Sequence, residues 1–101
     1  MATTQPHPAQ PAPSTPPGTA LAVQVVAPDG TLWSGDARQV TVPSASGSLG
    51  VLPRHEPLAA VLVAGTVRVR PTATEVVEIA ITGGFVVVDD DDVTVLVDAV
   101  A

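Results

Sequence analysis

A histidine next to a glutamate is the first pair of side chains in this sequence that could carry chemistry. His55-Glu56 matches the first two positions of the HExxH zinc motif, in which two histidines bind the metal from one face of a helix. The fifth position here is Ala59 instead of histidine, and Pro57 would interrupt the helix that the motif requires. The pair therefore does not indicate a zinc protease.

The serines at positions 44, 46 and 48 and the aspartates from Asp89 to Asp92 are the other candidates for chemistry. The serines lie near His55 in the sequence, but the chain has no G-x-S-x-G elbow and no evident group to orient a base. The aspartate run lacks the spaced carboxylates, central glycine and distal glutamate of an EF-hand loop. No glycine-rich phosphate loop is present either. We therefore predict no catalytic, cofactor-binding or metal-binding residue, and we interpret the aspartates as a solvated hairpin tip.

Charge and aromatic content exclude several classes of binding protein. The 101 residues include four arginines, no lysine and ten carboxylates, which gives a formal net charge of −6. Binding to nucleic acid draws on cationic side chains that neutralise phosphates, so nucleic acid is not an expected partner. Trp33 and Phe85 are the only aromatic residues, too few for a base-stacking platform. We expect Phe85 in the core and Trp33 in the core or at an interface wall.

Apolar residues recur with a period of two along much of the sequence, which is typical of half-buried strands. Apolar residues alternate with polar or small ones in four stretches, at Val23 and Val25, Val40 and Val42, Val67 and Val69, and Val77, Ile79 and Ile81. Turn residues recur between such stretches, at Pro28–Gly30, Ser34–Asp36, Ser44–Gly47, Ala64-Gly65, Gly83-Gly84 and Asp89–Asp92. The pattern predicts an all-β fold, an antiparallel sandwich or flattened barrel. Gly83-Gly84 is predicted to permit a bulge or bend at the entry of a strand.

The first eighteen residues differ in composition from the rest. They hold six of the eleven prolines and no charged side chain, and they cannot bury enough apolar surface to offset the entropy of ordering. We predict a disordered Pro/Ala/Thr-rich tail over residues 1–18 and one domain over residues 19–101. Because the tail has neither a basic start nor a long apolar run, we expect no signal peptide.

The most distinctive segment is GSLGVLPRHEPL, from Gly47 to Leu58. Its glycines permit unusual backbone angles, while Pro53 and Pro57 fix φ and remove two amide donors. We therefore expect neither a helix nor a plain strand here, but a sharp turn with a rigid polar tip. The block VVAPDGTLWSG precedes this segment, and the blocks GTVRVR and ITGGFVVVDDDDVTVLVDA follow it. In this order and spacing, the four blocks together resemble the epsilon subunit of F-type ATP synthases.

The resemblance covers Leu21 to about Ala99 and implies a flattened sandwich of about ten strands. In this family the domain is a non-catalytic rotor subunit that joins the gamma subunit to the membrane c-ring within the alpha/beta/gamma/delta/epsilon assembly. It implies a peripheral location at the cytoplasmic face of the bacterial plasma membrane, and no cofactor. The implied c-ring contacts are Ser48, Leu49, Gly50, Val51, Arg54 and His55, and the implied gamma contacts are Ala27, Pro57 and Ala60.

Two residues depart from the family pattern, which often has an acidic residue in place of Ser48 and a glycine in place of Arg54. Members of the family also continue into a pair of helices that can restrain or sense ATP, whereas this sequence stops at Ala101. The resemblance therefore leads us to expect a subunit that couples the rotor without regulating it. Two alternatives stay open: a small acidic β-sandwich binding module on a Pro-rich linker, and a metal-dependent enzyme built on the aspartates and the two histidines.

Overall fold

The structure is a computed structural model and describes residues 20–101. This part of the chain contains nine strands. The strands are β1 (Leu21–Ala27), β2 (Gly30–Ala37), β3 (Gln39–Ser44), β4 (Gly47–Val51), β5 (Leu58–Leu62), β6 (Gly65–Arg70), β7 (Val77–Ile81), β8 (Gly84–Asp89) and β9 (Asp92–Val97). The predicted all-β class is confirmed. The predicted tail over residues 1–18 lies outside the described residues.

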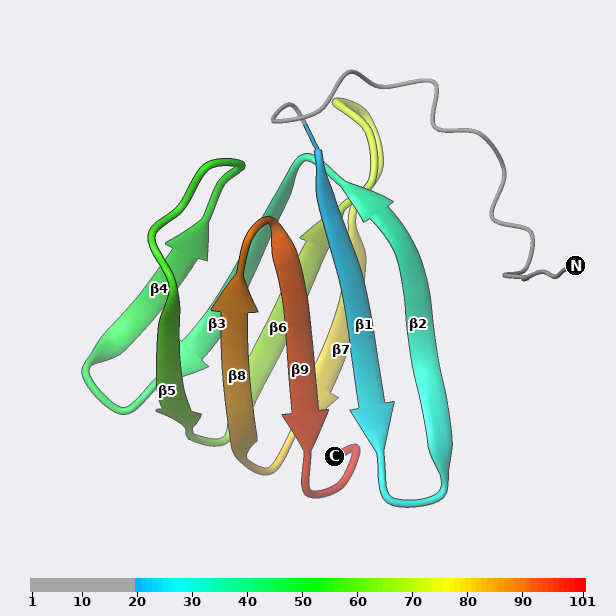
Figure 1. The fold of residues 1–101 in the computed structure, drawn as a ribbon. Coiled ribbons are helices and arrows are strands. Elements are labelled where there is room, and N and C mark those ends of the chain that lie inside the picture. The colour runs from blue at the N-terminus through cyan, green and yellow to red at the C-terminus, as the bar shows by residue number, and fades with distance from the viewer. Residues whose placement is uncertain (1–19) are drawn as a thin grey trace, which may run out of the picture.

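The strands form one strongly curled sheet in the order β2-β1-β9-β8-β5-β3-β6-β7, with β4 paired to the other side of β3. Figure 1 shows β3, β6 and β7 crossing behind β8, β9 and β1, so that the curled sheet has two layers. The layers are joined where the end of β3 meets β5, at the pair Ser44 and Leu62, and again where Ile81 of β7 forms a bridge with Val100. Two layers with apolar inner faces are the arrangement expected of a β-sandwich.

One strand pairing differs from the prediction of a purely antiparallel sheet. Strands β1 and β9 run parallel, from the pair Ala22 and Asp92 to the pair Val26 and Leu96. Every other strand pair is antiparallel. A hairpin can join only antiparallel neighbours, and β1 and β9 lie at opposite ends of the domain sequence, so no turn constrains their relative direction.

The core is built mainly from valines, of which those on β1, β3 and β6 were singled out by the alternation in the sequence and those on β8 and β9 were not. Strand β1 has the burial pattern of a half-buried strand, and β3, β6, β8 and β9 place two or more valines inward. The fully buried valines include Val23, Val25, Val40, Val42, Val67, Val69, Val86, Val88, Val93 and Val95. Burying each of them contributes about 1.5–3 kcal/mol relative to an exposed side chain, so this shared core determines which face of each strand points inward.

Three local predictions are wrong. Ser34–Asp36 is not a turn but part of β2, where Gly35 leaves room for the ring of Trp33; a Cβ there would lie 3.2 Å from the ring. Gly47–Val51 is a regular strand, because each of its residues pairs with a residue of β3. The side chain of Phe85 is 38% exposed, since its neighbour Val86 takes the inward position on β8.

Within residues 20–101 there is no helix long and apolar enough to cross a membrane.

Candidate docking site

The segment Gly47–Leu58 divides into a strand and a turn. In β4 the side chains alternate: Ser48 and Gly50 lie on the surface, while Leu49 packs against the core and Val51 is completely buried. Of the four predicted c-ring contacts in this strand, Ser48 and Gly50 therefore present a free outer surface. Val51 offers a partner no side-chain surface, and Leu49 offers only part of one.

The turn after β4 carries the other predicted ring contacts. Pro53 and Arg54 form the turn, and Arg54 has a φ of 67°, in the left-handed region that favours glycine. This geometry explains why the family that the sequence resembles often has a glycine in place of Arg54. His55 is half-buried, and its Nδ1 lies 2.7 Å from the carbonyl oxygen of Glu56. Leu52, which sequence reasoning missed, is 54% exposed at the start of the same turn.

The aspartate run lies against this turn. The backbone amide of Arg54 donates a hydrogen bond to Oδ1 of Asp91 at 2.6 Å, across 37 residues of sequence. Arg54, His55 and Pro57 line one side of a shallow depression, and Asp89, Asp90 and Asp91 line the other. The hairpin tip predicted for the aspartates is confirmed, since Asp89 pairs with Asp92 at the end of β8 and β9. Its contact with the turn was not predicted, because no local pattern links the two segments.

The three predicted gamma contacts do not form one cluster. Ala27 is buried at the end of β1. Pro57 is exposed at the opposite end of the sandwich, beside the turn that Asp90 and Asp91 form between β8 and β9, called the aspartate turn below. Ala60 pairs with the buried Val86, so it belongs to the inner face of β5. Its sequence neighbours Ala59 and Val61 point outward and are exposed.

An exposed apolar row crosses the outer face of the layer that contains β5, β8, β9, β1 and β2 (Figure 1). The register places Val61 of β5 beside Phe85 of β8, which in turn lies beside Leu96 of β9. Their side chains are 58%, 38% and 45% exposed, and Val87 adds a fourth exposed apolar side chain on β8. Contiguous exposed apolar side chains of this kind mark interaction surfaces. The run Phe85–Val88 was a signal for this row, because a strand that is apolar on both faces has two surfaces to cover.

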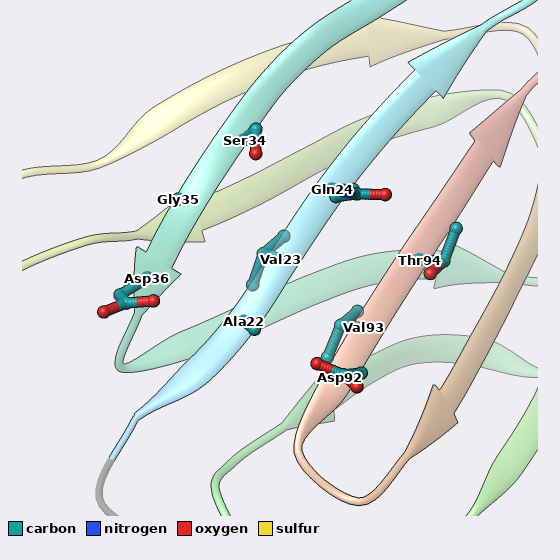
Figure 2. A pocket seen from close by; sticks show the side chains of 9 residues that line it. All are labelled: Ala22, Val23, Gln24, Ser34, Gly35, Asp36, Asp92, Val93 and Thr94. Atoms are coloured by element: carbon teal, nitrogen blue, oxygen red, sulfur yellow. The ribbon is translucent and has the colours of Figure 1, made fainter. Parts of the chain in front are cut away.

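Further along the same face the side chains become polar. Figure 2 shows Gln24, Ser34 and Thr94 on three adjacent strands, with Asp36 and Asp92 closer to the aspartate turn. Asp36 and Asp92 are the cross-strand neighbours of Ala22 on either side. The outer face thus runs from an acidic end, through uncharged polar residues, to the apolar row.

The arrangement offers little for catalysis. Among residues 20–101 no group of three or more histidine, cysteine, aspartate or glutamate side chains is arranged to hold a metal ion. Ser44 is buried and its hydroxyl donates to the carbonyl oxygen of Gly47 at 2.5 Å. Within residues 20–101, none of the serines at positions 44, 46 and 48 forms a hydrogen bond with His55.

Comparison with known proteins gives these surfaces a context. Residues 20–101 match the family described as ATP synthase, Delta/Epsilon chain, beta-sandwich domain. The ATP synthase epsilon chain of Synechococcus elongatus is 48% identical over 79 residues, which cover 78% of this chain and 57% of the relative. The epsilon chain of Halalkalibacterium halodurans is also 48% identical over 79 residues, covering 78% and 59%. This chain therefore spans a little over half the length of the curated relatives it matches.

Two solved structures share the fold at low sequence identity. One is a chain of the Euglena gracilis mitochondrial ATP synthase, in a structure of OSCP, F1 and the c-ring, with a TM-score of 0.78 and 19% identity over 96% of this chain and 62% of that one. The other belongs to the central stalk and c-ring of the Tetrahymena thermophila mitochondrial enzyme, with a TM-score of 0.68 and 18% identity over 80% of this chain and 65% of that one.

Proposed function

Because this chain belongs to the ATP synthase delta/epsilon family through its beta-sandwich domain, we propose that it is the epsilon subunit of an F-type ATP synthase. In this role it is a non-catalytic part of the central stalk that joins the gamma subunit to the membrane c-ring. It turns with them as one rotor and supports proton-coupled ATP synthesis. The subunit sits peripherally at the cytoplasmic face of the bacterial plasma membrane, within the alpha/beta/gamma/delta/epsilon assembly.

The family match carries the identity, and the structural observation that supports docking on a partner is the exposed apolar row of Val61, Phe85 and Leu96. Three adjacent large apolar side chains exposed to water on a small domain are favourably covered by another protein. We assign this face to gamma. Ala60 lies on β5 between the outward-pointing Ala59 and Val61, so its backbone borders the row, while its side chain packs on the inner face.

We assign the turn after β4 to the c-ring. Ser48, Gly50, Arg54 and His55 supply polar and backbone groups, and the exposed Leu52 supplies an apolar anchor among them. Val61 lies three residues beyond Leu58, the first residue of β5, which corresponds to about 10 Å at the rise of an extended strand, and the turn precedes Leu58. The two surfaces are thus separate, and one subunit can hold both partners at once.

The test of the gamma face is a charge placed in the apolar row. We expect Val61→Asp to weaken binding to purified gamma by about tenfold or more, because a carboxylate in the centre of an apolar interface must be desolvated. Val76→Asp is the matched control, since Val76 is also an exposed valine, at 44% against 58%, but precedes β7 in the other layer. Isothermal titration calorimetry with each variant measures the difference.

Equal affinity of the Val61→Asp and Val76→Asp proteins for gamma would contradict the assignment of this face. Failure of the unmodified chain to bind either gamma or the c-ring would contradict the proposed function as a whole. Both variants are checked first by thermal unfolding, because a change in binding is informative only when the sandwich remains folded.

A further inference from the structure

Three residues with unusual backbone angles meet at one end of the sandwich. Within residues 20–101, Arg54, Asp90 and Asp91 are the non-glycine residues with positive φ, at 67°, 52° and 64°. Such a backbone conformation is unfavourable for a residue with a side chain and persists only where its surroundings hold it in place. Asp90 and Asp91 are held by the hairpin of β8 and β9, whose two-residue turns commonly require positive φ at both positions.

Arg54 has no such hairpin to hold it. Between Pro53 and Pro57 the chain has three backbone N–H groups, and in the described part of the structure the N–H of Arg54 is the one with a protein acceptor. That acceptor is the carboxylate of Asp91, at 2.6 Å. A hydrogen bond from an amide to a charged acceptor is among the stronger kinds, so it offsets the unfavourable angle at Arg54.

Asp91 also joins a third segment. Its backbone carbonyl accepts a hydrogen bond from the amide of Ala22 at 2.8 Å, at the start of β1. Asp91 is half-buried, whereas Asp89, Asp90 and Asp92 are exposed. One residue therefore connects the start of β1, the aspartate turn and the turn that carries Arg54 and His55.

We propose that Asp91 is a positioning residue, which holds the turn around Arg54 in the conformation that docks on its partner. The inference rests on the proposed function, because the partner of that turn is the c-ring. Asp91 need not touch the ring. It acts by ordering the turn before binding, so that less conformational entropy is lost on docking.

The test compares two substitutions in the same aspartate turn. Asp91→Gly and Asp90→Gly each remove one carboxylate from a position with positive φ, where glycine is free of strain, so they change charge and backbone preference alike. We expect Asp91→Gly to raise the amide exchange rate of Arg54 about tenfold and to weaken binding to purified c-ring about three- to tenfold. Asp90→Gly leaves both within twofold of the unmodified chain by the same reasoning.

A conservative variant separates positioning from general stability. Asp91→Asn keeps an acceptor oxygen and tolerates the left-handed region, so it should restore slow exchange at Arg54 and most of the ring affinity. Identical behaviour of the two glycine variants would overturn the proposal, and so would fast exchange at Arg54 with unchanged ring binding. The exchange measurement needs only the isolated chain, so it still tests the link to Asp91 if the unmodified protein does not bind the ring and the proposed function fails.

Discussion

At the scale of single residues, Gly84 is the position where the backbone leaves least room. It opens β8, and a Cβ added there would overlap the carbonyl oxygen of Leu96 and lie 2.9 Å from the Cα of Val97. Both groups are backbone of the neighbouring strand and cannot rotate away. Gly50 of β4 is the opposite case, because a Cβ there would meet the side-chain amide of Gln39 at an ordinary 3.6 Å.

We therefore expect Gly84→Ala to lower the free energy of unfolding by about 2–4 kcal/mol, because β8 and β9 must move apart. For a domain of this size that corresponds to a fall in melting temperature of roughly 10 °C or more. Gly50→Ala should change stability by less than about 0.5 kcal/mol. Thermal unfolding followed by circular dichroism tests both, and similar melting temperatures for the two variants would show that the β8–β9 contact adapts to the added carbon.

At the scale of elements, some of the structure could be predicted from the sequence and some could not. Alternation identified the buried valines of β1, β3 and β6, because each stretch has one apolar parity. It failed for Phe85, because in the run Phe85–Val88 both parities are apolar and only the packed core decides which faces inward. The contact of Arg54 with Asp91 spans 37 residues and depends on how β5 and β8 pair, so no local pattern contains it.

The turn between β4 and β5 gives a prediction at this scale. Leu49→Asp is a poor test of docking, because Leu49 packs on the core and the substitution would also destabilise the sandwich. Leu52→Asp changes a side chain that is 54% exposed, and we expect it to weaken c-ring binding about tenfold or more. Leu32→Asp is its matched control, a 39% exposed leucine at the bulge of β2. If both variants bind the ring alike, Leu52 is not an anchor.

At the scale of the whole molecule, charge is distributed unevenly over the sandwich. The end of the sandwich that carries Arg54 and His55 also carries Arg38, Arg70 at the end of β6, and the aspartate turn. The opposite end has Asp29 and Asp98 as its charged residues in the described part of the chain. The apolar row lies on the outer face, toward the end that carries Asp98. This distribution agrees with the proposal that the polar end docks on the ring and the apolar face on gamma.

A clamp that transmits torque through two contacts in series makes a specific prediction for coupling. If gamma is held by the row around Val61 and the ring by the turn around Leu52, losing either contact uncouples the rotor. We expect Val61→Asp and Leu52→Asp each to reduce proton-driven ATP synthesis about tenfold when added to an epsilon-depleted enzyme at a concentration that saturates the unmodified chain. Because the contacts act in series, the double variant should be little worse than the more severe single one. Losses that multiply in the double variant, with Val76→Asp and Leu32→Asp as folded controls, would mean that the two surfaces contribute independently and do not form one clamp.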